Sequence, residues 1–458
     1  MGGDMMTEEL FIKNVAQQIR CVKAREGIER ELSDHIADQT AAYEETGETH
    51  EEAVRRAVQE MGDPVEVGVE LDRIHRPQTD YKMIGMAFIF SVLGYFLLCA
   101  VNAEGLAEYP EYLFRQRFIL LLSFGVMMGI YFLDYTFIGR YAYGIYIFLT
   151  IAIYCSLEAA MRKGAVSLAF MMVYLYVPVY AGILYRLRRG GYRAIILAIA
   201  MQIVTTGFAV VVSLYMAMNI CLMCTALLVI AIWKKWFAVN RKAALLFFTG
   251  VIVLFLTAVF VFGVYRTGWE NGFKTQRLLG WLWPEKYAEG AGYIYMWIRS
   301  MLGEAKFIGP SESNPYVEGA VLGSPIPYPT EPFVLFQVIC EYGILAGLLV
   351  VLALMAVVVR AFQIVKRQQN QLGFMISAAC FIVLLVNCTE GILMNSGYCP
   401  VSSMQLPFLS QGACTAIVYA AMIGLLFSIY RNERIVTDKM IELHRRRRLK
   451  ISVKLEKR

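Results

Sequence analysis

GYCPVSSMQLPFLSQGA, residues 397–413, separates the last two apolar segments of the chain and predicts a loop that re-enters the edge of a membrane. Pro400 and Pro407 each stop a helix, because proline lacks a backbone N–H and disfavours helix in the residue before it. Gly397 and Gly412 permit turns that other residues resist. Irregular backbone at this depth is tolerated only where it is buried in protein or lines a wet cavity. We therefore expect this segment, called the elbow below, to form part of a cavity wall, with an ordinary hairpin between helices as the alternative.

The composition is that of a polytopic membrane protein. Of 458 residues, 58% are hydrophobic and 17% are charged, and the mean hydropathy is +0.52. These values are too apolar for a soluble globular chain. No signal peptide is expected, because the first long apolar run begins only near Met83. The net charge of +6 is modest, and we expect no nucleic-acid partner.

Cysteine and histidine are placed for packing rather than for metal binding. Cys221 and Cys224 have the C-x-x-C spacing that indicates zinc or redox chemistry in soluble proteins. No His or second Cys pair accompanies them here, so packing is the better interpretation. The four histidines form no cluster with metal-ligand spacing. The sequence therefore predicts no protein metal site and leaves a divalent cation open as a cofactor.

The first 77 residues are polar and carry helix signals. Thr49–Glu52 fits a capping box, and Asp63 followed by Pro64 is typical of a helix start. We expect residues 1–77 to form a small cytosolic domain of three or four helices. Its arrangement, Glu31–Ile36 followed by Met61–Pro64, resembles the short helical prefix domain found before several bacterial permease-like proteins.

Ten apolar runs predict ten membrane-spanning helices, because about 20 apolar residues are needed for each span. An even number puts both termini on one side, and the loops rich in Lys and Arg share that side with a basic tail, residues 432–458. The positive-inside rule makes it the cytoplasm. The predicted fold class is thus all-α, with a polytopic transmembrane domain, residues 78–431, added to the cytosolic domain and tail. The spans lie near residues 83–101, 118–133, 142–159, 166–185, 193–213, 216–233, 243–265, 333–359, 372–395 and 406–430.

One extracytoplasmic loop, from about residue 266 to about residue 331, is far longer than the others. Long loops without periodicity are usually functional. Its aromatic residues most often mark the headgroup level. Arg277 and Lys306 are nevertheless suited to a phosphate, Arg as a bidentate fork and Lys as a point charge.

Ionisable residues within the predicted spans are few, and two carboxylates among them stand out. A charge in the membrane is costly, so Glu341 and Glu390 indicate a functional or cavity-facing role. Glu341 falls about nine residues into the eighth span, roughly 13 Å from its outer end at 1.5 Å per residue. A structural carboxylate, hydrogen-bonded to a neighbouring helix, is the alternative for both.

The elbow resembles the late signature of the shape, elongation, division and sporulation family, the group of RodA, FtsW and SpoVE. That signature reads roughly P-V-T-G-x-x-L-P-F-x-S-x-G-G. The positions in register are Pro400, Val401, Ser402, Leu406, Pro407, Phe408, Ser410 and Gly412. The positions that depart from it are Ser403, Gln411 and Ala413.

Upstream stretches carry more of the same resemblance. Glu341, Gly343 and Gly347 keep the E-x-G-x-x-x-G spacing that opens the family's eighth span. Ala305–Gly309 looks like a worn version of the family's G-K-G-L-G turn. Further matches in the long loop are Arg277, Pro284, Gly292 and Tyr293.

The resemblance implies a peptidoglycan glycosyltransferase of the bacterial cytoplasmic membrane, which polymerises lipid II outside beside a class B penicillin-binding protein, a transpeptidase. A loop carboxylate would be the general base, and basic residues would stabilise the diphosphate leaving group. Ungapped alignment back from Gly343 puts the family's catalytic Asp on Pro332. Glu331 is the candidate base if the turn shifts by one residue, about 3.3–3.6 Å of chain. The candidate substrate-binding residues are Arg277, Lys306, Glu341, Ser402 and Ser410.

Two family motifs are missing. The Q-P-S-E-x-x-K pattern has no counterpart between Arg162 and Tyr180, and the P-D-x-G-T turn is absent around Ser213–Asn219. Because function lives in sites rather than folds, two other functions stay open. One is a non-catalytic scaffold or regulator that binds lipid or a transpeptidase partner and takes its input through residues 1–77. The other is a lipid flippase or transporter.

Overall fold

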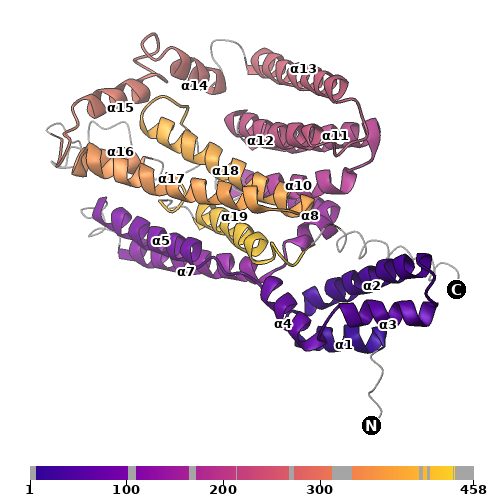
Figure 1. Ribbon diagram of the computed structural model, residues 1–458. Helices are drawn as coiled ribbons and strands as arrows, with labels where there is room; N and C mark the ends of the chain where they lie inside the picture. Colours follow the sequence, from indigo (N-terminus) through magenta and orange to yellow (C-terminus); the bar gives the residue numbers. More distant parts are fainter. Residues whose placement is uncertain are drawn as a thin grey trace. The chain divides into compact units, whose positions relative to one another are not determined.

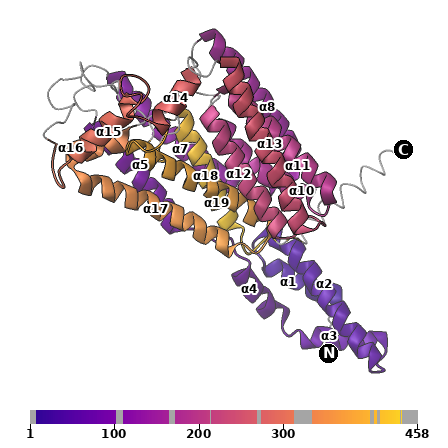
Figure 2. The same cartoon turned by 90° about the horizontal axis from the view of Figure 1, so that it is seen from above.

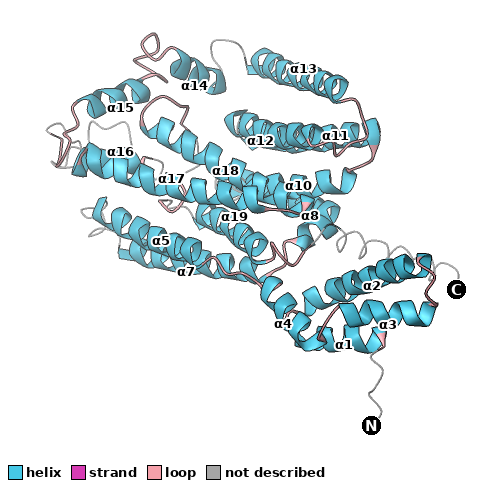
Figure 3. Cartoon of the chain, in the orientation of Figure 1, coloured by secondary structure: helices cyan, strands magenta, loops and turns pink. Residues whose placement is uncertain are grey.

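The computed structural model describes residues 7–101, 110–163, 172–212, 214–267, 273–311, 333–401, 406–409, 413–436 and 438. Every regular element among these residues is a helix (Figure 1, Figure 3). The chain divides into two compact units, one formed by Met1–Thr79 with Tyr430–Arg458 and the other by Asp80–Ile429. The predicted all-α class is confirmed.

The smaller unit contains four short helices around an apolar core that includes Phe11, Val15, Ile19 and Ile36. The predicted capping box is present at the start of the third helix, where the Thr49 and Glu52 side chains each satisfy the other's backbone. The four helices are α1 (Glu8–Gln18), α2 (Val22–Glu45), α3 (His50–Glu60) and α4 (Pro64–Ile74).

Asp72 is a buried carboxylate that fastens α4 to the end of α1. It is only 6% exposed, and its Oδ1 accepts a hydrogen bond from the backbone N–H of Arg20 over 2.8 Å. Its Oδ2 accepts a second bond from the Arg76 guanidinium over 3.2 Å. The Arg20 N–H, helped by Arg76, holds the pKa of Asp72 below its usual range, although burial acts in the opposite direction. The ionised form of Asp72 therefore stabilises this unit.

The larger unit is a bundle of apolar helices, and each predicted span overlaps at least one helix among the described residues; residues 166–171 of the fourth span lie outside them. Within the described residues, five helices are long and apolar enough to cross a membrane, among them Ile344–Arg367 and Gln371–Asn395. The helices are α5 (Tyr81–Val101), α7 (Pro110–Phe132), α8 (Thr136–Lys163), the 3-10 turn η1 (Val173–Leu175), α10 (Tyr176–Leu187), α11 (Gly191–Val212), α12 (Leu214–Trp233), α13 (Arg241–Thr267), α14 (Phe273–Leu282), α15 (Tyr293–Gly303), α16 (Val334–Tyr342), α17 (Ile344–Arg367), α18 (Gln371–Asn395) and α19 (Ala413–Arg431).

Helix α18 is the centre of this bundle. It packs against α8, α10, α12, α16 and α17, and both ribbon views place it between the α10–α13 group and α17 (Figure 1, Figure 2). Its contacts bury polar as well as apolar side chains, including Asn387 and Asn395, each 1% exposed. Helix α18 therefore connects α10 and α12 with α16 and α17.

Two spans differ from the prediction for backbone reasons. The eighth, expected as one run over residues 333–359, is broken at Gly343 into α16 and α17. The tenth begins at Ala413 instead of near residue 406. Leu406–Leu409 form a turn, in which Phe408 has a φ of +66°, a left-handed value that a right-handed helix cannot contain.

Candidate functional site

One non-helical stretch, Lys306–Ser311, caps both helix ends at the break in the eighth span. The N–H groups of Ile344 and Leu345 donate to the carbonyls of Lys306 and Phe307 over 3.0 and 3.1 Å. In the other direction, the N–H groups of Gly309 and Ser311 donate to the carbonyls of Tyr342 and Cys340 over 3.1 and 2.9 Å. Helix ends leave such backbone groups without intrahelical partners. This stretch, called the cap strand below, satisfies them.

Gly343 makes the break possible. Its φ of +95° and ψ of 170° lie in a region open essentially to glycine alone. A Cβ atom at this position would lie 2.8 Å from the Phe307 carbonyl oxygen and 2.9 Å from the Ile308 Cα atom. The glycine is thus required both by its conformation and by the close approach of the cap strand.

The break brings two of the predicted site residues to one place. Lys306 is exposed and belongs to the cap strand, whereas Glu341 is half-buried near the end of α16. The Nε2 amide of Gln337 donates to Oε1 of Glu341 over 3.3 Å within the same helix. A cationic and an anionic side chain therefore flank the same helix break.

The first half of the elbow is bound to α14 and α15 by three hydrogen bonds. Arg299 Nε donates to the Gly397 carbonyl over 3.0 Å, and Trp281 Nε1 donates to the Tyr398 carbonyl over 2.9 Å. The backbone N–H of Val401 donates to the Tyr295 hydroxyl over 3.3 Å. The guanidinium carbon of Arg299 also lies 4.3 Å from the centroid of the Tyr398 ring, a cation–π contact. These contacts fix the elbow on α14 and α15.

Arg277, the third described candidate, lies beside this attachment. It is exposed on α14, and its charge acts on the Tyr295 hydroxyl. Burial raises the pKa of Tyr295, and the Val401 N–H and then Arg277 oppose that rise. Tyr295 therefore stays protonated at neutral pH, as a hydroxyl that accepts the bond from the elbow.

An apolar cluster lies under these polar groups. It joins α15, α16, the end of α18 and the elbow, so that the four segments share one core. Its buried members are Ile298, Phe333, Phe336, Cys340, Met394 and Cys399. Asn395 adds a polar link, because its Oδ1 accepts the N–H of Phe336 over 2.9 Å.

Glu390 belongs to a second polar link, between α12, α18 and the elbow. The Nδ2 amide of Asn219, 6% exposed, donates to Glu390 Oε2 over 2.8 Å. One turn away on α12, the Tyr215 hydroxyl lies 2.8 Å from the Sγ atom of Cys399. Glu390 thus has a hydrogen-bond partner on a neighbouring helix, which was the structural alternative for this carboxylate.

Sequence reasoning missed Asn219, Tyr215, Trp281 and Arg299. Each is a single polar or aromatic residue in an otherwise apolar or interfacial segment. The only signal was the presence of an Asn inside a predicted span. Three predicted residues, Glu331, Ser402 and Ser410, lie outside the described residues, as does Pro332.

The side chains that could ligate a metal form no metal centre within the part of the chain that the structure describes. Within the ranges given above, no group of three or more His, Cys, Asp or Glu side chains is placed to hold a metal ion.

The fold and site define a multi-pass membrane protein in which the segment before the eighth span is hydrogen-bonded both to the break in that span and to the elbow. The profile of the family described as cell cycle protein, FTSW_RODA_SPOVE, matches residues 78–435. That match covers more than half of the chain, and the chain belongs to this family.

Curated relatives match part of the chain. It is 29% identical over 171 residues to the probable peptidoglycan glycosyltransferase FtsW of Idiomarina loihiensis, covering 37% of this chain and 41% of that protein. It is 26% identical over 171 residues to the peptidoglycan glycosyltransferase MrdB of Escherichia coli K12, covering 37% and 45%. The matched region thus spans less than half the length of these relatives.

Solved structures show the same fold. One chain, from a structure entitled "Structural coordination of polymerization and crosslinking by a peptidoglycan synthase complex", is 16% identical with a TM-score of 0.57, covering 78% of this chain and 98% of that one. A mutant of the Thermus thermophilus rod shape determining protein RodA is 13% identical with a TM-score of 0.50, over the same shares. At these identities the likeness concerns the fold.

Proposed function

We propose that this chain is a peptidoglycan glycosyltransferase that polymerises lipid II, a lipid-linked disaccharide-peptide, at the outer face of the bacterial cytoplasmic membrane. The observation that carries the proposal is the pairing of the cap strand with the break at Gly343. It joins the stretch that resembles the family's loop turn to the stretch that keeps the family's E-x-G spacing. Family membership and the attached elbow support the same function.

In the proposed reaction, Glu331 is the general base. It takes the proton of a sugar hydroxyl while that oxygen attacks the anomeric carbon of the second substrate, and the bond from this carbon to the diphosphate oxygen breaks. Arg277 and Lys306 neutralise the departing diphosphate. Glu341, Ser402 and Ser410 line the substrate cavity and orient the sugars.

We further propose the arrangement of the chain around this reaction. Both termini, with the domain of residues 1–77 and the tail of residues 432–458, lie in the cytoplasm, which follows from the positive-inside rule. The partner is a class B penicillin-binding protein that cross-links the new glycan. The peptidoglycan synthase complex named above, which coordinates polymerization and crosslinking, supports such a pairing.

The test is polymerisation of labelled lipid II by the purified full-length protein, alone and with a cognate transpeptidase. We expect polymer from the wild type and at least a hundredfold less from Glu331→Gln, because removing a general base costs about 10²–10⁴ in rate. Glu289→Gln, which changes an exposed carboxylate of the same loop, serves as the matched control. Equal polymer from wild type and Glu331→Gln would remove Glu331 from the mechanism.

A non-catalytic scaffold is the second candidate, and one observation favours it. Pro332 stands where ungapped alignment places the family's catalytic Asp, and proline cannot be a base. A scaffold predicts that lipid II or the transpeptidase still binds while no combination yields polymer. Loss of biological function in Glu331→Gln, with expression and partner binding unchanged, would count against it.

A further inference from the structure

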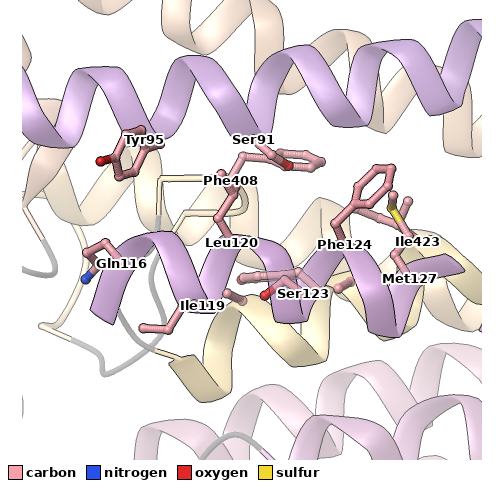
Figure 4. A pocket seen from close by; sticks show the side chains of 13 residues that line it. Ser91, Tyr95, Gln116, Ile119, Leu120, Ser123, Phe124, Met127, Phe408 and Ile423 are labelled. Carbon is pink, nitrogen blue, oxygen red and sulfur yellow. The ribbon is translucent and has the colours of Figure 1, made fainter. Parts of the chain in front are cut away.

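A cleft lies between α5, α7 and α19, with Phe408 of the elbow in its wall (Figure 4). Its volume is about 70 Å³. Most of its lining is apolar, including Ile119, Leu120 and Phe124 from α7 and Ile423 from α19. The Oγ atom of Ser123 is buried and has no hydrogen-bond partner among the described residues. This cleft is separate from the polar groups assigned above to the candidate site.

The length of the cleft corresponds to one half of a bilayer. Its lining on α7 runs from Gln116 to Met127, which is about 16 Å at 1.5 Å per residue. The hydrocarbon core of a bilayer is about 30 Å thick. A single acyl chain of one leaflet has the same extent, whereas a long polyprenyl chain exceeds it.

A guanidinium stands at one end of the cleft. Arg117 Nε donates to the hydroxyl of Tyr95 over 2.9 Å, and Tyr95 lines the cleft. Arg117 is exposed, so its remaining N–H donors can reach a phosphate oxygen. One guanidinium matches the single negative charge of a phosphodiester, whereas a diphosphate calls for several cations.

The surfaces around the cleft are strongly apolar. Both α5 and α7 coincide with predicted spans, and their outward side chains are exposed, as expected for helices in contact with acyl chains. Examples are Phe96 at 62% and Ile89 at 60% on α5, with Phe114 at 76% and Leu121 at 71% on α7. The cleft is therefore continuous with a lipid-facing surface.

We propose that this cleft binds one acyl chain of an anionic glycerophospholipid of the membrane, with its headgroup phosphate on Arg117. The site goes beyond the proposed glycosyltransferase activity and does not depend on it. The bound chain packs against Phe408 and so supports the elbow from the lipid side.

The elbow is placed to respond to this lipid. The Phe408 and Phe90 rings meet edge to face with centroids 6.1 Å apart. A Cβ atom on Gly94 would lie only 2.0 Å from the Phe408 carbonyl oxygen, so α5 and the elbow touch along their backbones. Binding or release of the acyl chain in the cleft therefore changes the contacts of Leu406–Leu409 with α5.

The experiment is native mass spectrometry of the full chain in detergent, titrated with phosphatidylglycerol, with phosphatidylcholine and with a polyprenyl monophosphate. We expect a retained phosphatidylglycerol adduct on the wild type. Arg117→Gln removes the phosphate contact and Ser123→Phe fills the cleft, and each is expected to weaken that adduct at least tenfold. The matched controls are Lys242→Gln, which removes an exposed charge at the start of α13, and Leu121→Phe, which enlarges an outward side chain of α7.

Each outcome bears on the proposal. Equal phosphatidylglycerol binding by all variants would overturn the site. Equal binding of phosphatidylcholine, which has the same phosphodiester but no net charge, would overturn the preference for an anionic lipid. Tighter binding of the polyprenyl phosphate would replace the proposed occupant by a carrier lipid. If Ser123→Phe does not fold, Ala420→Leu fills the same cleft from α19, and Arg117→Gln tests the headgroup independently. Loss of lipid II polymerisation would not mimic these results, because the readout is lipid mass and not activity.

Discussion

The Nδ2 amide of Asn219 on α12 donates a hydrogen bond to Oε2 of Glu390 on α18 across 2.8 Å, and it does so where Asn219 is only 6% exposed. This bond joins the central helix to α12, which also carries Tyr215 against Cys399 of the elbow. The carboxyl group of Glu390 is therefore part of the support of the elbow.

Replacing Glu390 tests this support. Glu390→Leu leaves the Asn219 amide buried without its acceptor, which costs about 1–3 kcal/mol of stability. Glu390→Gln keeps an acceptor oxygen and is expected to cost less. The stability of both variants is measured by thermal unfolding of the purified protein, with the fraction that remains unaggregated after heating as the readout. Thr389→Val, which removes an exposed hydroxyl bonded within its own helix, is the control, and an equal effect from it would contradict the prediction.

Gly343→Ala tests the broken span. The new Cβ atom would lie 2.8 Å from the Phe307 carbonyl oxygen, and a non-glycine residue at this φ costs about 1–3 kcal/mol in addition. We expect a lower melting temperature and loss of the cap strand's protection from proteolysis. Gly303→Ala is the matched control, because a Cβ atom added at Gly303 would have no other atom within 4 Å. A Gly343→Ala protein as stable as Gly303→Ala would mean that the break is not needed.

Arg299→Ala tests the attachment of the elbow. It removes the Nε donor to the Gly397 carbonyl and the contact with the Tyr398 ring. Cys399 is 8% exposed, so its thiol reports on this segment. In a protein with the other cysteines replaced, we expect a membrane-impermeant maleimide to label Cys399 at least severalfold faster after Arg299→Ala. Lys286→Ala, on the same loop, should leave the rate unchanged.

The stability of the smaller unit should fall in acid because of Asp72. Its pKa is depressed in the folded state, chiefly by the Arg20 N–H. The stabilisation is therefore present above the unfolded-state value of about 3.9 and is lost as pH falls through the lower folded value. Hydrogen exchange of α1 and α4 amides, corrected for intrinsic rates, should show this loss. The Asp72→Asn variant should be less stable than the wild type at pH 7. It should also lack the loss of stability that Asp72 causes as the pH falls.

Regular helices were predictable from this sequence, and their interruptions were less so. Long apolar runs locate the ten helical segments because backbone groups in a membrane must be satisfied within a helix. The break at Gly343 depends on hydrogen bonds from residues 306–311, which lie far away in the sequence, and no periodicity within the span reports them. Pro407 did signal a turn, yet the tenth span was expected to include it.

The candidate site was predictable where charge was involved. Arg277, Lys306 and Glu341 stand out as ionisable groups in an apolar chain, and the structure puts Lys306 and Glu341 at one helix break. Arg299 looks like any other interfacial Arg until its contacts with Gly397 and Tyr398 are known. The assignments of Glu331, Ser402 and Ser410 stay predictions.

The cap strand holds the broken span through backbone groups alone. Because carbonyl and amide groups are the same in nearly every residue, the side chains at positions 305, 307 and 308 are free to drift in evolution without loss of the turn. Gly343 has no such freedom. Divergence of the loop motif in this chain is therefore compatible with an unchanged turn, and selection on the geometry should be sought at Gly343 and at Gly309, whose φ is +89°, rather than at the other side chains of the strand.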